Sequence, residues 1–334
     1  MDELKIEEKK SKKTKLLPLI LILPILFLIF YSQYPKSFGN FFGIKEEQKT
    51  VLTEIQPIQE VQTQPEIKTE ENNAIPEEKI KEEDTKEEVP KEEVPRPDLT
   101  IGIIADAHAG QEHGFSLLNL AVSTLRNQVQ PDIVVDLGDL IESRVDYKEI
   151  SKKSAEADYK KASSIIASSF QTYHVVGNHE LLSMSKDNVE NLIGRKNRYI
   201  ANVKGYQIIV LDANYTEKED HIDAKHDDSF IYTGTLTSGA LDWLENRLKE
   251  SSKNIIFIHH PIWNLENKSE VSRIFKKYSD KIIFTANGHK HPNTLGIISF
   301  GGINNYNIPS AYHQRTIAVV KIKGNDAKVS IKKY

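Results

Sequence analysis

The sequence predicts a mixed α/β domain in which two β-sheets pack together and helices cover their outer faces. Two observations support this fold class. From Leu99 onward, short apolar runs rich in β-branched residues alternate with segments whose apolar residues recur at helical spacing. Beyond Tyr199 the pattern changes to pairs of strands separated by turn residues. Strand–helix units followed by hairpins are typical of two packed sheets with helices outside.

The first part of this domain reads as three strands separated by two helices. Strands are expected at the β-branched runs, which cover 99–106, 131–139 and 171–180. Pro131 opens the second strand and Gly138 closes it. Helices are expected where apolar residues fall on one face, at 115–129 and 149–168.

The second part begins with a hairpin at 198–214 that turns around Lys204 and Gly205. Thr237 or Ser238 then caps a helix that runs to Glu250. The remaining strands are expected at 254–261 and 281–287, and a hairpin with a Gly-Asn-Asp turn at 316–334.

Composition excludes several classes of function. The 334 residues include no cysteine, which excludes disulfides, zinc ribbons and thiol nucleophiles. Residues 99–334 carry 29 basic and 27 acidic residues, so the domain has no electrostatic footprint for nucleic acid. Nothing in the sequence indicates an obligate protein partner.

The N-terminal region predicts a membrane anchor. A basic tail at 1–15 precedes an apolar stretch at 16–34, in which residues 16–31 carry no charge. Lysines before the stretch predict a cytoplasmic N-terminus, a single membrane pass and an extracytoplasmic domain. A cleaved secretory signal is the alternative, although no A-x-A-like site follows the stretch.

Residues 35–98 predict a disordered linker between the anchor and the domain, which is expected over 99–334. The part at 45–98 contains 17 acidic residues, eight basic residues, six prolines and no glycine. Its apolar residues are too sparse to offset chain entropy, and its prolines interrupt helices.

Polar clusters follow five of the apolar strands, where a core would gain nothing from them. These clusters are Asp106-Ala-His108, Gly138-Asp139-Leu-Ile-Glu142, Gly177-Asn178-His179-Glu180, His259-His260-Pro261 and Gly288-His289-Lys-His291. Loops at strand ends of α/β sheets converge on a shared crevice. Imidazole and carboxylate together suit Mn, Fe, Zn or Ni.

Five further histidines are expected to be lone surface residues: His113, His174, His221, His226 and His313.

In order and spacing, these clusters resemble the calcineurin-like metallophosphoesterase superfamily, whose signature is D-x-H, G-D, G-N-H-[DE], H and G-H-x-H. The resemblance implies a four-layer α/β/β/α sandwich and two divalent metal ions, with Mn²⁺ the first choice in vitro. One ion would be held by Asp106, His108 and His291. The other would be held by Asn178, His259 and His289, with Asp139 bridging both. His259 is preferred to His260 because the superfamily pattern is H-x-P.

The resemblance also implies a reaction. Two cations would clamp a phosphate ester and activate a bridging water for in-line attack. His179, next to the ligand Asn178, would act as the general acid for the leaving group, and Glu180 would orient the His179 ring. Glu142 stands where purple acid phosphatases carry an iron-binding tyrosine, so no Fe(III) charge-transfer site is expected.

The leading hypothesis is therefore a membrane-tethered phosphoesterase that acts on mono- or diesters. A catalytically silent surface module on the same fold is a second hypothesis, which the complete ligand set disfavours. A third is a cytoplasm-facing hydrolase of lipid phosphates, which the lysine distribution disfavours.

Overall fold

The computed structural model describes residues 98–145, 148–222 and 233–334. The predicted tail at 1–15, the apolar stretch at 16–34 and all of the linker except Asp98 lie outside the described residues. None of the helices in the described ranges is both long enough and apolar enough to cross a membrane.

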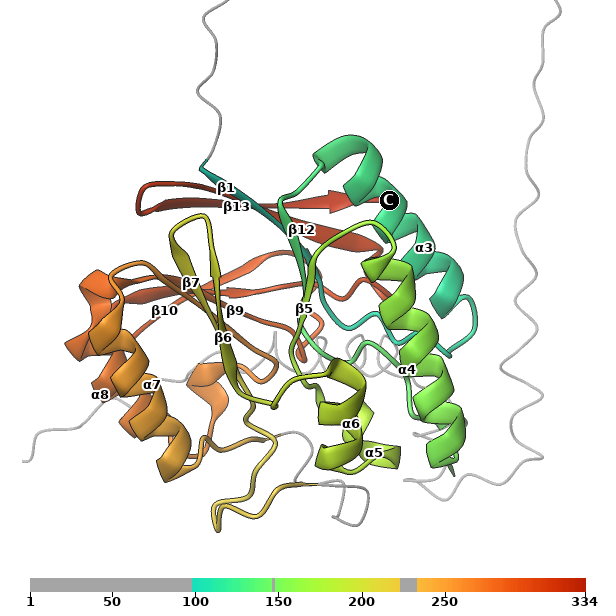
Figure 1. Ribbon diagram of the computed structural model, residues 1–334, viewed down its shortest axis with the longest axis horizontal. Coiled ribbons are helices and arrows are strands. Elements are labelled where there is room, and N and C mark those ends of the chain that lie inside the picture. The colour runs from blue at the N-terminus through green and yellow to red at the C-terminus, as the bar shows by residue number, and fades with distance from the viewer. Residues whose placement is uncertain (1–97, 146–147, 223–232) are drawn as a thin grey trace, which may run out of the picture. The chain divides into compact units, whose positions relative to one another are not determined.

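The first sheet has five strands in the order β13-β12-β1-β2-β5 (Figure 1). Its centre is β1 (Leu99–Ile104), which pairs in parallel with β2 (Ile133–Asp136) and antiparallel with β12 (Thr316–Lys323). The edges are β5 (Thr172–His174) and β13 (Asp326–Lys333). The predicted C-terminal hairpin is confirmed as β12 and β13.

The second sheet has six strands in the order β10-β11-β9-β8-β7-β6. Their bounds are β6 (Tyr199–Val203), β7 (Tyr206–Leu211), β8 (Asn254–Ile258), β9 (Ile282–Asn287), β10 (Gly296–Phe300) and β11 (Ile303–Asn307). Strands β7, β8, β9 and β11 run in parallel. The predicted turn between β6 and β7 is confirmed, with φ of 48° at Lys204 and 83° at Gly205. A third, short sheet pairs β3 (Arg144–Val145) with β4 (Lys148–Glu149).

Two of the predicted helices begin with a side-chain cap, and the cap of the second, Thr237, is one of the two that the sequence predicts. Helix α4 (Lys152–Ala167) starts after Ser151, and α7 (Ser238–Glu250) starts after Thr237; each cap side chain accepts a backbone N–H of the first turn. Helix α3 (Gly114–Thr124) continues as a π-helical turn at Leu125–Val129. The sequence prediction did not include α6 (Lys186–Ile193), α8 (Lys268–Lys277) or the short 3₁₀ turns Ile262–Asn264 and Ser279–Lys281.

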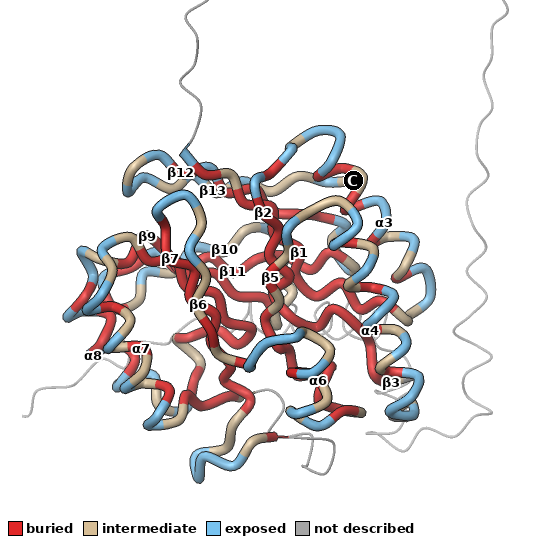
Figure 2. Tube along the Cα trace, in the orientation of Figure 1, coloured by how far each residue is buried: buried red, intermediate tan, exposed pale blue. Residues whose placement is uncertain are grey.

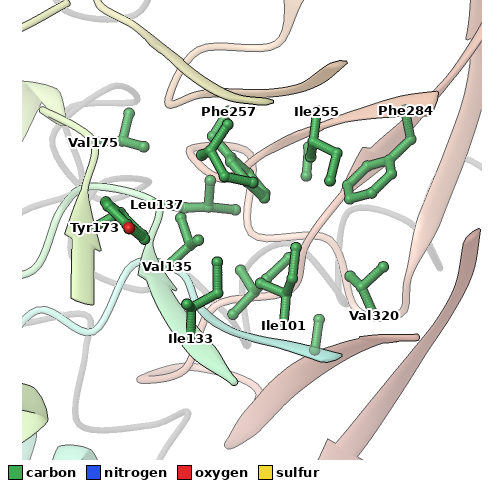
Figure 3. Close-up of a cluster of buried hydrophobic side chains, with 14 of the residues drawn as sticks. Ile101, Ile133, Val135, Leu137, Tyr173, Val175, Ile255, Phe257, Phe284 and Val320 are labelled. Atoms are coloured by element: carbon green, nitrogen blue, oxygen red, sulfur yellow. The ribbon is translucent and has the colours of Figure 1, made fainter. Parts of the chain in front are cut away.

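Alternation along the strands creates the layers. In β1, Ile101 and Ile103 belong to the core between the sheets, whereas Ile104 packs under α3 and α4. In β8, Ile255 and Phe257 face the same central core and Ile256 packs under α7 and α8. Figure 3 shows the central cluster, to which both sheets contribute, and Figure 2 shows buried strands with more exposed helices outside them. The predicted arrangement of two packed sheets with outer helices is confirmed.

The predicted strand over 171–180 is too long. The strand β5 ends at His174, and a short helix, α5 (Asn178–Ser183), begins after Gly177. The side chain of Glu180 accepts the backbone N–H of Gly177 at 2.8 Å, as the third residue of a helix commonly does for its N-cap. Asn178 and His179 therefore lie in the first turn of a helix rather than at a strand end.

Candidate metal centre

The seven predicted metal ligands converge on one edge of the two sheets. Asp106 and His108 follow β1, Asp139 follows β2, and Asn178 opens α5 after β5. On the second sheet, His259 follows β8, and His289 and His291 follow β9. Because the parallel strands that precede them end at the same edges, residues far apart in sequence come together.

Hydrogen bonds join the loops that carry these residues. The N–H of His108 donates to the Asp139 carbonyl at 3.0 Å, and the N–H of His289 donates to Asp106 Oδ1 at 2.8 Å. Gly138 allows a close approach, because a Cβ there would lie 2.7 Å from the Gly177 nitrogen and 2.8 Å from His259 Nδ1. The loop positions are thus fixed by the protein itself.

Backbone strain is concentrated at the same place. Positive φ values, which non-glycine residues rarely adopt, occur at five of the predicted ligands: Asp106 (52°), His108 (43°), Asp139 (51°), His289 (70°) and His291 (44°). Each such conformation costs roughly 1–3 kcal/mol and is typical of functional sites. The surrounding fold thus holds the backbone of these five residues in a strained conformation, which fixes the direction of their side chains.

The first group of possible ligands consists of Asp106, His108, Asp139 and His291. Their donor atoms all lie within 4.8 Å of one another. The Nε2 atoms of His108 and His291 are 3.3 Å apart, and His291 Nε2 is 3.3 Å from Asp106 Oδ1. Asp106 Oδ2 is buried and has no hydrogen-bond partner among the described residues. We call this group the rim cluster, because the His291 side chain is 27 % exposed.

The second group consists of Asp139, His259 and His289, joined by Asn178, and we call it the buried cluster. The donor atoms of its two histidines and Asp139 lie within 4.8 Å of one another. His259 Nε2 is 3.2 Å from Asp139 Oδ2, and Asn178 Oδ1 is 3.1 Å from His259 Nε2 and 2.9 Å from His289 Nδ1. Asp139 is the one residue of these two groups that belongs to both.

The donor set fits a divalent cation. His259 Nδ1–H donates to the Leu137 carbonyl at 2.8 Å, which directs Nε2 toward the Asp139 carboxylate and the Asn178 oxygen. Burial lowers the pKa of His259, but the carboxylates of Asp139 and Asp106 outweigh it and raise that pKa to about 10. The carboxylates thus favour positive charge at His259, whereas burial and the neighbouring rings of His260 and His259 hold the pKa of His289 well below its ordinary value. The nitrogen and oxygen donors of the cluster are those that Mn, Fe, Zn and Ni bind.

His179 lies beside the rim cluster and contacts a carboxylate other than the one predicted. Its Nδ1–H donates to Glu142 Oε1 at 2.8 Å, and its Nε2 is 3.9 Å from Asp139 Oδ2. Burial lowers the pKa of His179, but Asp139 and Glu142 outweigh it and raise that pKa to about 9. Burial also opposes ionisation of Glu142, yet the rings of His108 and His179 hold the pKa of Glu142 at about 2.

Glu180, which was expected to orient the His179 ring, serves the backbone instead. Its carboxylate accepts three N–H groups, from Gly177, Asp139 and Ile141, at 2.8, 3.1 and 3.3 Å. Adjacent residues of a helix point in different directions, so Glu180 and His179 do not face each other. Glu180 therefore stabilises the loop that carries Asp139. The sequence placed Glu142 in the second cluster but did not predict its contact with His179.

The five histidines expected to be lone surface residues differ from one another. His113 matches the expectation, with a 75 % exposed side chain, and His226 lies outside the described residues. The expectation is wrong for His174 and His221, which contact the buried carboxylates of Asp136 and Asp212 at 2.9 and 3.1 Å. It is also wrong for His313, whose donor atom lies within 4.8 Å of those of His108 and His291. His260 packs against His259 and His289.

Comparison with known proteins identifies the family. Residues 99–293, more than half of the chain, match the calcineurin-like phosphoesterase family. No curated protein matches the chain.

Similar solved structures include NAD nucleotidase from Haemophilus influenzae, with 16% identity over 70% of this chain and 49% of that protein and a TM-score of 0.45. Sulfate thiohydrolase SoxB from Thermus thermophilus shows 13% identity over 72% of this chain and 57% of that protein, with a TM-score of 0.48. This chain thus spans about half the length of these two proteins. Such low similarity transfers no activity. The family match covers all five clusters that converge at the sheet edges, and the chain belongs to the calcineurin-like phosphoesterase family.

Proposed function

We propose that the protein is a metal-dependent phosphoesterase that hydrolyses phosphate mono- or diesters at a dinuclear centre. The observation that carries this proposal is that Asp139 belongs to both ligand clusters, as a carboxylate that bridges two cations would. Membership of the family supports hydrolysis of phosphoester bonds.

The two clusters define the ligand sets of this proposal. Asp106, His108 and His291 would hold one divalent ion, and Asn178, His259 and His289 would hold the other. Asp139 would contribute to both. When bound, the ions would supply positive charge for the phosphoryl oxygens and would make water a stronger nucleophile.

The side chain of His179 would hold the proton that the leaving group needs. Its Nδ1–H is already donated to Glu142, which fixes the ring and leaves Nε2–H for the substrate. Glu142 also raises the pKa of His179 and so favours the protonated ring. Proton donation from a positioned histidine of this kind contributes about 10²–10⁴ to the rate.

The direct test is an assay of the full chain in detergent, loaded with Mn²⁺ and offered p-nitrophenyl phosphate, bis-p-nitrophenyl phosphate and a panel of nucleotides. We expect hydrolysis that chelation abolishes and Mn²⁺ restores. A protein that binds two ions per chain and hydrolyses none of these esters would instead support the silent binding module.

We further propose that residues 16–34 anchor the protein in a membrane, with the N-terminus cytoplasmic and the phosphoesterase domain outside. The support is the charge and hydropathy of the sequence. Protease added to intact cells should release an active fragment by cutting within 45–98. Cleavage only after lysis would reverse the orientation, and a mature N-terminus near residue 35 would indicate a cleaved signal.

A further inference from the structure

The loop between β11 and β12, residues 308–315, forms an additional wall beside the rim cluster. It is tied to the loops that carry the predicted ligands. The hydrogen bonds are Ser310 Oγ to the Asp106 carbonyl (2.8 Å), Ala311 N to the Ala105 carbonyl (2.7 Å) and Gln314 Nε2 to the His291 carbonyl (3.4 Å). The loop therefore keeps a fixed position relative to Asp106 and His291.

His313 lies on this loop, where a hydrogen bond fixes its backbone and its ring is exposed. Its N–H donates to Ser310 Oγ at 3.0 Å. The ring centroid lies 4.8 Å from that of His291, 5.7 Å from that of His108 and 5.0 Å from that of Tyr312. No side chain or backbone group in the described part of the chain hydrogen-bonds to the ring nitrogens. The ring is thus positioned by packing and keeps its polar atoms for another partner.

The position of the ring decides what that partner is. A His313 nitrogen lies within 4.8 Å of donor atoms of His108 and His291, yet the group that also includes Asp106 and Asp139 does not include His313. Because His313 is exposed and is not grouped with Asp106 and Asp139, it lies on the solvent side of the two histidines, away from the bridging carboxylate.

We propose that His313 is a substrate-contacting residue, whose ring N–H donates a hydrogen bond to a phosphoryl oxygen on the exposed side of the rim cluster. The proposal rests on the proposed phosphoesterase function. If ions at the two clusters held a phosphate, its remaining oxygens would be anionic acceptors within reach of a donor on the exposed side of the rim cluster. Hydrogen bonds to charged groups are stronger than neutral ones, so the contact should matter for affinity.

The test compares His313→Ala with His313→Gln and with the matched control His113→Ala. His113 is a second histidine at the surface, immediately before α3. Its side chain is 75 % exposed, and it belongs to neither cluster. Three quantities are measured on the Mn²⁺-loaded full chain: metal content by elemental analysis, affinity for inorganic phosphate by calorimetry, and KM and kcat for p-nitrophenyl phosphate.

We expect His313→Ala to keep both ions and to weaken the binding of phosphate roughly 10-fold, the loss expected for one hydrogen bond to a charged group. KM should rise by a similar factor, and His313→Gln should recover part of the affinity because its amide also donates. His113→Ala should match the wild type in all three quantities.

Two results would overturn the proposal: unchanged phosphate affinity in His313→Ala, or loss of an ion, which would make His313 a ligand. Neither result bears on the phosphoesterase function itself. Conversely, a wild-type protein that hydrolyses no ester, but whose phosphate affinity still depends on His313, would refute the function and support the contact.

Discussion

The two clusters of the candidate metal centre have similar ligands but different surroundings. The His259 side chain of the buried cluster is 1 % exposed, whereas the His291 side chain of the rim cluster is 27 % exposed. His179, Glu142 and His313 all contact or approach the rim cluster. In the buried cluster, His259 is held by the Leu137 carbonyl and packs against His260. Under the proposed function, this difference predicts that the groups around the substrate differ mainly on the rim side, where side chains outside the ligand set gather.

The largest effect should come from Asp139, the residue that both halves share. Asp139→Asn removes a negative charge from each cluster, so we expect activity to be abolished and bound metal to fall well below that of the wild type. Elemental analysis and the p-nitrophenyl phosphate assay measure the two losses. Two tightly bound ions in the variant would contradict the bridging role and would make the halves independent.

His179→Ala should separate proton donation from metal binding on the rim side. Both ions should remain, because His179 is not among the residues proposed as ligands. Turnover should fall by about 10²–10⁴ for esters of alkyl alcohols, whose leaving groups need a proton. The loss should be much smaller for p-nitrophenyl phosphate, since its leaving anion is stable. An equal loss for both leaving groups would indicate charge stabilisation, and loss of an ion would make His179 a ligand.

Glu142 and Glu180 provide a matched pair of variants, because Glu142 contacts the His179 ring and Glu180 contacts backbone N–H groups. Glu142→Gln removes the charge that helps to keep His179 protonated, so the pKa of His179 should fall and the alkaline limb of the rate profile should move to lower pH. Turnover of alkyl esters should drop roughly 10-fold. Glu180→Gln should leave that limb in place and lower the free energy of unfolding by about 2 kcal/mol, since an amide oxygen cannot accept all three N–H groups.

If Glu180→Gln moves the pH profile and Glu142→Gln does not, the predicted pairing of Glu180 with His179 would be restored. Chemical denaturation of the chelated protein provides the stability measurement, and p-nitrophenyl phosphate serves as the substrate for which neither change should have a large effect.

The smallest difference is expected in stability without metal. In chelator, His259→Ala should reduce the free energy of unfolding by roughly 2 kcal/mol, because it leaves a cavity and an unpaired Leu137 carbonyl. His291→Ala, at a part-exposed position, should cost less than about 0.5 kcal/mol. Each variant should lose one ion in metal-loaded protein. Equal losses of stability would show that the two halves are equally part of the core.

The residues at strand ends could be predicted because an apolar run that stops at Asp, Asn or His gains nothing for the core. That reasoning located Asp106, Asp139, His259 and His289 at the sheet edge where the structure gathers them. The role expected for Glu180, to orient the neighbouring His179 ring, came from the resemblance and is wrong, because Glu142 makes that contact. A one-residue step in α5 turns the Glu180 side chain away from His179, whereas the sequence pattern predicts a strand end at this position.

His313 could not be predicted from the sequence, since its place depends on a long-range pairing. Strand β11 runs in parallel beside β9, which lets the Ile308 N–H donate to the Asn287 carbonyl at 2.8 Å. That contact places the loop at 308–315 beside Asp106. The Asn-rich strand β11 was itself not predicted, so no local pattern placed His313 near the centre.

The position of β12 also governs the order in which the protein can be completed. Leu99 opens β1 opposite Ile322, so the first strand of the described residues is synthesised long before its antiparallel partner β12. Ala318, Val320 and Ile322 of that late strand fill the core between the sheets. Pairings over such sequence separations form slowly. The sheet of the described domain that contains β1 therefore stays incomplete until β12 has been synthesised.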